Sequence, residues 1–181
     1  MKIGIRIKKA NQDATRDSLS AAPHGCMSQA MKTVLALVDF SDVTASVLRQ
    51  AQDLAKAYAG RVIIMHVLKL EPVVVDVGLA SPTVLRPPTE AVIQAGKATL
   101  EGFRASMEGT GITVTTEQLP DATMAKILEE SGRLGADIIV VGSHHHSALY
   151  DLFIGSFTHD LLKLATCPVL VVPAVTDAGP Q

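Results

Sequence analysis

Residues 138–158 read IIVVGSHHHSALYDLFIGSFT, and this stretch combines the features that decide the fold. A short apolar run, typical of a buried strand, ends in Gly142-Ser143. Thirteen residues after Gly142, a second glycine, Gly155, opens an amphipathic segment that begins with Ser156-Phe157-Thr158. A glycine turn after a strand and a glycine at the start of a helix both direct backbone N–H groups toward phosphate. The stretch therefore predicts a phosphate-binding edge on an α/β sheet.

The composition is that of one folded domain. The chain has 181 residues, 48% of them hydrophobic, and a formal net charge of −2. Its apolar runs are much shorter than the roughly 18 residues of a membrane helix, and its central part has no basic cluster for nucleic acid. We expect no secretory signal and no disulfide between Cys26 and Cys167. These features predict a cytoplasmic protein.

Three segments differ in character. Residues 1–31 mix charged and polar residues with the turn-like Ala22-Pro23-His24-Gly25, and predict a disordered or weakly ordered N-terminal extension. Met27 and Met31 are alternative starts within it. Residues 32–175 predict a single α/β domain, and residues 176–181 a short C-terminal tail.

Strand-like apolar runs alternate with helix-period segments in the domain. We expect strands at 33–39, 61–68, 112–118, 136–141 and 168–173, the third more exposed than the others. We expect helices from Ser41-Asp42 to Gly60, over 89–108, from Asp121 onward and over 155–165. Residues 69–88 form a long connection with an extended piece at 73–77. This alternation predicts a doubly wound, five-stranded parallel sheet of order 3-2-1-4-5 with helices on both faces.

The predicted strand order also predicts where a ligand binds. Open parallel sheets bind ligands beyond the carboxyl ends of their strands, at the point where the strand order reverses. Here that point lies between the first and fourth strands, which end in Val38-Asp39-Phe40-Ser41 and Val141-Gly142-Ser143. The glycine turn and the predicted crevice therefore coincide.

Motifs spread over residues 31–175 resemble those of the universal stress protein family. They occur in the family's order: Leu37-Val38-Asp39-Phe40-Ser41, Met65-His66-Val67, Gly142-Ser143-His144, Gly155-Ser156 and Cys167-Pro168-Val169-Leu170-Val171-Val172-Pro173. In the branch of the family that binds ATP, the fingerprint is Gly, two residues, Gly, nine residues, then Gly with Ser or Thr. This chain has Gly142, His145 and Gly155-Ser156, so a histidine replaces the second glycine.

The resemblance implies a Rossmann-like stress-response or signalling protein that binds ATP, with or without Mg²⁺. It places Val38, Asp39 and Val67 at the adenosine. At the ribose and phosphates it places Val141, Gly142, His145, Gly155, Ser156, Phe157 and Thr158. His145 leaves two interpretations open: a histidine adopts left-handed backbone more readily than most residues, or its ring obstructs the phosphates. The alternative function is a nucleotide-free protein that acts through protein contacts.

Several of these residues also have simpler interpretations. Asp39 could cap the first helix, Ser156 and Thr158 could be ordinary helix residues, and His66 is expected to be packed and hydrogen-bonded in its strand. A metal site on residues 144–146 with Asp151 or His159 is a weaker alternative, because successive side chains alternate in direction and zinc needs three or four ligands.

Catalysis has little support in the sequence. Ser156 has no evident base, and the segment from Gly142 to Gly155 contains no Lys or Arg. Phosphoryl transfer needs a positioned nucleophile and a charge clamp. We therefore assign no catalytic residue and expect at most slow ATP hydrolysis.

The last strand predicts the assembly. It is an edge strand in the order 3-2-1-4-5, and Val169, Leu170, Val171 and Val172 are apolar on both faces. Such an edge is covered or pairs with another chain. A two-fold homodimer is the simplest closed arrangement, and family members resemble this in pairing their last strands.

Overall fold

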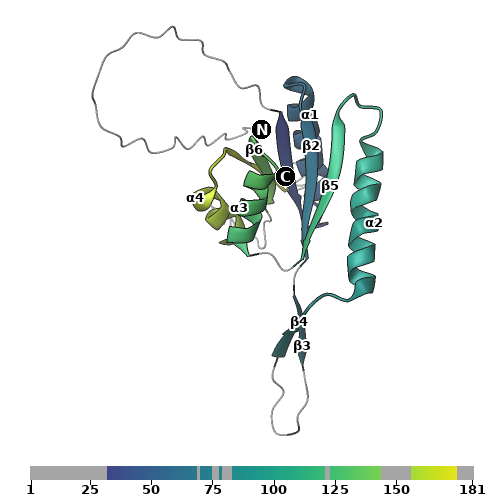
Figure 1. Ribbon diagram of the computed structural model, residues 1–181, viewed down its shortest axis with the longest axis vertical. Helices are drawn as coiled ribbons and strands as arrows, with labels where there is room; N and C mark the ends of the chain where they lie inside the picture. The colour runs from purple at the N-terminus through teal and green to yellow at the C-terminus, as the bar shows by residue number, and fades with distance from the viewer. Residues whose placement is uncertain are drawn as a thin grey trace, which may run out of the picture.

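The computed structural model describes residues 32–68, 70–74, 78, 83–120, 123–143 and 156–174. The extension predicted over residues 1–31, the C-terminal tail, Asp121, His145 and Gly155 lie outside the described residues. Within them, five strands form a parallel sheet in the order β5-β2-β1-β6-β7 (Figure 1). The strands are β1 (Thr33–Val38), β2 (Arg61–Leu68), β5 (Thr113–Pro120), β6 (Ile138–Ser143) and β7 (Val169–Pro173). In chain order this is 3-2-1-4-5, and the predicted topology is confirmed.

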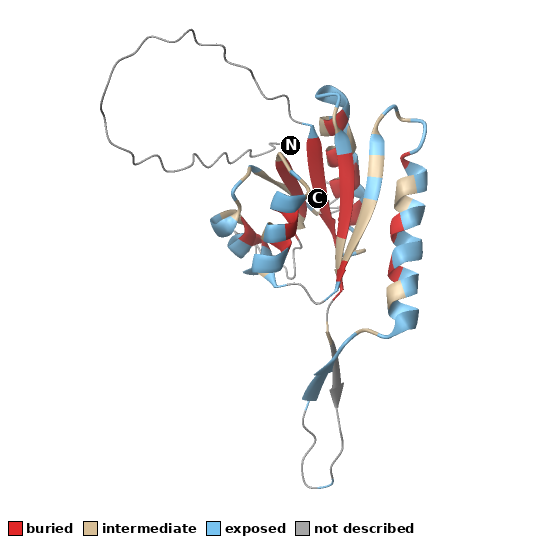
Figure 2. Ribbon diagram, viewed as in Figure 1, coloured by how far each residue is buried: buried red, intermediate tan, exposed pale blue. Residues whose placement is uncertain are grey.

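The central strand β1 is buried along its whole length (Figure 2). It pairs with β2 from Thr33 to Val38, and with β6 from Val34 to Leu37. At its start, the carboxylate of Asp137 accepts hydrogen bonds from the backbone N–H groups of Lys32 at 2.8 Å and Thr33 at 2.9 Å. A parallel strand covered on both faces requires a continuous apolar sequence, which is why the run after Lys32 was recognisable.

Helices cover both faces of the sheet, as predicted. They are α1 (Thr44–Ala57), α2 (Glu90–Ser106), α3 (Met124–Arg133) and α4 (Ser156–Leu164). α1 and α2 supply Val47 and Leu100 to the core on one face. α3 and α4 supply Ile127 and Leu161 to the core on the other face. Figure 1 shows α2 on one side of the sheet and α3 with α4 on the opposite side.

The predicted apolar faces of the helices are largely confirmed. α1 buries Val47, Leu48, Ala51 and Ala55 against the sheet. The helical period of the sequence also places Tyr58 and Val92 on the apolar faces of the first two helices, but both residues are exposed. Tyr58 follows the last helical residue of α1, and Val92 lies in the first turn of α2. The helical pattern of apolar residues therefore extends beyond the buried face, at the end of α1 and the start of α2.

Two predicted helix starts differ from the structure. α1 begins at Thr44 rather than at Ser41-Asp42, and its N-cap residue, Val43, makes no side-chain capping hydrogen bond. The Thr44 N–H instead donates to the Ser41 carbonyl at 3.1 Å, so residues 41–44 form a turn before the helix. α3 is capped by Thr123, whose hydroxyl accepts from the Lys126 N–H at 3.3 Å. Hydroxyl oxygens commonly satisfy such N-terminal donors.

The connection at 69–88 contains a hairpin that the sequence did not predict. β3 (Glu71–Val74) pairs antiparallel with β4 (Thr83–Arg86), and in Figure 1 this ribbon projects from the sheet between β2 and α2. β3 overlaps the start of the extended piece expected at 73–77. β4 has four residues before two prolines, too short a run to show a strand period. All four of its residues are exposed.

The described residues bear on two further expectations, a membrane span and a disulfide. None of its helices combines the length and the apolar character needed to cross a bilayer. Cys167 is a free cysteine, and burial raises the pKa of its thiol. A raised pKa keeps the thiol protonated and unreactive at neutral pH.

Candidate functional site

Three strand ends meet at the carboxyl edge of the sheet. Val38 pairs with His66 of β2, and Leu37 pairs with Val141 of β6. Because the three strands are parallel, the residues that follow these pairs lie beside one another at the carboxyl ends of the strands. The structure therefore brings Asp39, Val67 and Gly142 to one edge, at the point where the strand order reverses.

Asp39 organises the turn that follows β1. Its Oδ1 accepts a hydrogen bond from the Ser41 backbone N–H at 3.2 Å and another from the Ser41 hydroxyl at 2.6 Å. This is the local pattern by which aspartate side chains form turns. The N-cap position of α1 is held by Val43, so the alternative that Asp39 and Ser41 cap this helix is not what the structure shows. The Asp39 carboxylate is exposed at the edge, where a ligand can reach it.

Phe40 holds this turn against β2. Its φ of 62° is in the left-handed region, which is unfavourable for a residue with a side chain. Its ring stacks on the imidazole of His66, with centroids 3.9 Å apart and planes 19° apart, and it lies 6.0 Å from the ring of Phe103. His66 is thus a packed strand residue, as predicted. We attribute the unusual backbone of Phe40 to this aromatic packing.

Two predicted site residues can contribute only backbone groups. The side chains of Val38 and Val141 are buried in the cores on opposite faces of the sheet. Val67 is half-buried at the end of β2. Backbone N–H and C=O groups at strand ends are strong hydrogen-bonding groups that any ligand at this edge would meet.

Gly142 has a packing role that sequence analysis missed. A Cβ built on this residue would lie 2.3 Å from Cγ1 of Val43, well inside van der Waals contact. The glycine therefore allows the end of β6 to approach the start of α1. The sequence predicts only phosphate binding for Gly142. The apolar residue just before α1, Val43, is the signal that could have indicated this second role.

The first turn of α4 is divided between surface and interior. Ser156 is exposed and Phe157 is 42% exposed, whereas Thr158 is buried. The first N–H groups of any α-helix have no partner within the helix, so this turn can attract an anion. Ser156 is the more accessible of its two hydroxyls. Gly155 and His145, the remaining predicted members, lie outside the described residues.

The histidine run at 144–146 and Asp151 also lie outside the described residues. Within the described ranges, no three His, Cys, Asp or Glu side chains gather as a metal site would require. Among the described residues, the groups at this edge include the exposed Asp39 carboxylate, backbone groups of three strand ends and the first turn of α4. This set can hold a polar ligand that has both hydrogen-bond donors and negative charge.

Comparison with known proteins identifies the family. A family model for the universal stress protein family matches residues 31–173. The chain belongs to the universal stress protein family. The resemblance seen in its motifs is thereby confirmed over nearly the whole α/β domain.

Other universal stress proteins match this one along most of their length. Universal stress protein MJ0531 of Methanocaldococcus jannaschii is 28% identical over 141 residues, which cover 78% of this chain and 81% of that protein. Universal stress protein YxiE of Bacillus subtilis is 30% identical over 146 residues, which cover 77% of this chain and 97% of that protein.

Solved structures share the fold of this universal stress protein. The structure of hypothetical protein MJ0577 matches with a TM-score of 0.62 and 21% identity, covering 82% of this chain and 99% of that one. A universal stress protein in complex with cAMP matches with a TM-score of 0.58 and 19% identity, covering 81% of this chain and 99% of that one. The universal stress protein from Archaeoglobus fulgidus in complex with dAMP matches with a TM-score of 0.55 and 22% identity, covering 78% of this chain and 96% of that one.

The contact between Gly142 and Val43 predicts coupled substitutions. Gly142→Ala should lower the free energy of unfolding by about 1–3 kcal/mol, because the new methyl overpacks the junction. In the Val43→Ala background the same change should cost much less, because the clashing methyls are absent. Urea denaturation of the four proteins measures this coupling.

Gly102→Ala is the matched control for this cycle. A Cβ at Gly102 meets nothing within 4 Å, and the residue lies inside α2, so alanine there should be neutral or stabilising. Equal costs of Gly142→Ala with and without Val43→Ala would refute the packing role.

Proposed function

We propose that this universal stress protein binds an adenine nucleotide at the carboxyl edge of β1, β2 and β6, and that the nucleotide is ATP because the chain keeps two of the three fingerprint glycines, Gly142 and Gly155. We propose further that it works in the cytoplasm as a dimeric stress-response or signalling module with at most slow ATP hydrolysis. The observation that carries the proposal is the exposed Asp39 turn, which lies beside the end of β2 and the end of β6 at Gly142-Ser143. The neighbours in complex with cAMP and dAMP support an adenine nucleotide as the ligand class.

Contacts with the adenosine part of the nucleotide must supply most of the binding free energy. A helix N-terminus stabilises an anion by about 0.3–1 kcal/mol, and by up to about 2 kcal/mol when partly buried. Micromolar binding requires about 8 kcal/mol. The start of α4 therefore cannot hold ATP alone, with or without Mg²⁺ on its phosphates. The Asp39 carboxylate can accept from adenosine donors, and the backbone at Val67 can border the base.

Asp39→Asn should weaken ATP and AMP binding alike. Hydrogen bonds to a charged group contribute about 1.5–3 kcal/mol, so the loss should be about tenfold or more for both nucleotides. Isothermal titration calorimetry of the full-length protein measures it. Asp42→Asn removes the same charge from another exposed residue of the same turn. It should change the affinity less than about fivefold, the size of a surface charge effect of about 1 kcal/mol.

These two variants also test where the ligand lies. Equal losses for Asp39→Asn and Asp42→Asn would mean that only the general charge of the turn matters, and would contradict the assigned role of Asp39. If millimolar ATP gives neither heat nor thermal stabilisation with the wild-type protein, the nucleotide function itself is excluded.

His145 favours a second candidate, a nucleotide-free protein that acts through protein contacts. A histidine stands where the fingerprint has its second glycine. If its ring occupies the path of the phosphates, His145→Gly should strengthen ATP binding and leave AMP binding nearly unchanged. Calorimetry with both nucleotides measures this difference. If His145→Gly weakens ATP binding, the imidazole contributes to the site instead of blocking it.

Zinc is the probe for the less favoured metal site. Heat on titration of zinc alone, abolished by replacing His144 and His146 with alanine, would favour that alternative. The nucleotide proposal expects no such heat.

β7 is the proposed dimer edge. Among the described strands it pairs only with β6, and Val169, Leu170 and Val171 are half-buried in a single chain. We expect size-exclusion chromatography with light scattering to give about twice the 19.1 kDa mass of one chain at tens of micromolar protein. A monomer under these conditions would contradict pairing through β7.

A further inference from the structure

The opposite edge of the sheet, formed by β5, carries a groove. Among the described strands β5 pairs only with β2, so its outer edge has no neighbour there. Beside this edge, α2 and β5 enclose a hollow of about 580 Å³. Its lining includes Lys97 and Glu101 from α2 and Thr116 and Gln118 from β5. The hollow lies on the far side of the sheet from the proposed dimer edge.

The outer edge of β5 has the character of a strand that accepts a partner. Residues 113–116 read TVTT, four β-forming residues without charge, and Thr113 and Thr115 are exposed. Natural proteins usually guard such edges with charge or cover them. Nε2 of Gln118 is buried and has no hydrogen-bond acceptor within the described part of the chain. This atom lies directly against Gly96, so α2 packs closely over this part of β5.

The first nine residues of the chain have the pattern of such a strand. They read MKIGIRIKK, in which Ile3, Ile5 and Ile7 alternate with Gly4 and Arg6 between flanking lysines. Strict alternation of β-branched and polar residues is typical of a strand with one buried face. The alternating stretch spans residues 2–8, and β5 has eight residues. The family model begins at residue 31, so this stretch is outside the part shared with the family.

Charge favours contact between this stretch and the domain. Residues 1–31 contain five Lys or Arg and two Asp, a net charge of +3. The whole chain has a net charge of −2, so residues 32–181 have −5. The first nine residues contain four of the five basic side chains and no acidic one. Opposite net charges attract an extended segment to the domain at moderate ionic strength.

The chain is long enough to reach the groove. A strand beside β5 would lie three strand spacings from β1, about 14 Å away. The 23 residues from Lys9 to Met31 can span up to about 75 Å. A covalently linked segment also has an effective concentration in the millimolar range, which favours its own domain over that of another molecule.

We propose that residues 2–8 add to the outer edge of β5 as a sixth strand, in the groove between β5 and α2 of the same chain. The added strand would close the open edge and leave β7 available for dimerisation. The proposal does not depend on nucleotide binding.

Hydrogen exchange at β5 in the full-length protein tests this assignment. Ile5→Pro removes a backbone donor and fixes φ within the stretch, whereas Ile5→Val keeps its β-forming character. Those backbone amides of residues 113–119 that point away from β2 should exchange about tenfold faster in Ile5→Pro than in the wild type, a factor that corresponds to about 1.4 kcal/mol. Ile5→Val should exchange like the wild type. Equal exchange in Ile5→Pro and the wild type would overturn the proposal.

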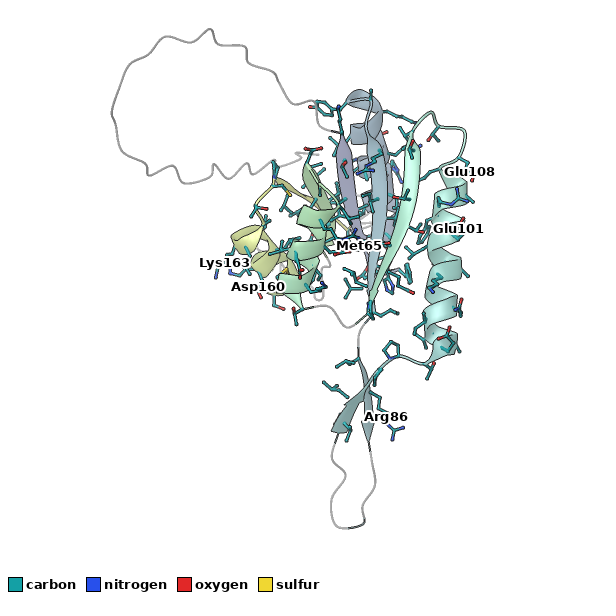
Figure 3. All side chains as sticks on the ribbon, viewed as in Figure 1. Met65, Arg86, Glu101, Glu108, Asp160 and Lys163 are labelled. Atoms are coloured by element: carbon teal, nitrogen blue, oxygen red, sulfur yellow. The ribbon has the colours of Figure 1, made fainter. Side chains whose placement is uncertain are left out.

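A second pair of variants locates the contact in the groove. Glu101→Lys and Glu108→Lys each remove one ion pair with Arg104 and change the charge equally. Glu101 lies on α2, and Glu108 lies in the turn that follows the helix (Figure 3). Of the two, Glu101 lines the groove. Glu101→Lys should speed the hydrogen exchange of the β5 amides, and Glu108→Lys should leave their exchange rate unchanged. Equal effects of the two would refute the groove as the binding site.

Two further readouts separate this proposal from its rivals. Each amide of β1 should exchange at the same rate in all these variants as in the wild type, because residues 2–8 protect only the outer edge of β5. A parallel change in β1 would assign the effect to the whole domain and overturn the proposal. Protection of β5 that rises with protein concentration would assign the strand to a second copy and would also overturn it.

Discussion

The parallel pairing of β1 with β2 on one side and β6 on the other is the constraint on which the rest of this structure depends. β1 is buried on both faces, so its register is fixed by its packing as well as by its hydrogen bonds. The side chain of Asp137 holds the start of this strand beside β6. At the other end, the same register delivers three chain segments to one edge. The candidate site is therefore a consequence of how the central strand is held.

Two close contacts turn this shared edge into a defined surface. Phe40 adopts a left-handed backbone and stacks on His66, which fixes the turn after β1 against β2. Gly142 lies against Val43, which fixes the end of β6 against the start of α1. Backbone held in an unfavourable region persists only where its surroundings determine it, and such places often serve function. Here Asp39, with its exposed carboxylate, directly precedes Phe40 in the chain.

The sheet was predictable because burial on both faces leaves continuous apolar runs, and the strand order followed from right-handed crossovers. Asp39 and Gly142 could be placed at one edge from that order alone, whereas Val67 was assigned by the resemblance to the family. Val38 and Val141 were assigned to the site without any signal that their side chains point into the two cores. The stacking of Phe40 on His66 joins residues 26 positions apart, and the Gly142–Val43 contact joins residues 99 positions apart. Such contacts leave no local pattern. The hairpin of β3 and β4 was missed because its strands are too short to show a period.

The central claim is that the ends of β1, β2 and β6 form an adenine-nucleotide site. The most direct test is the ¹H–¹⁵N NMR spectrum of the full-length protein during titration with AMP. We predict that the largest shifts occur at residues 39–43, at Val67, at Gly142 and Ser143, and in the first turn of α4. Shifts concentrated in the groove between α2 and β5, or no shifts at millimolar AMP, would contradict it.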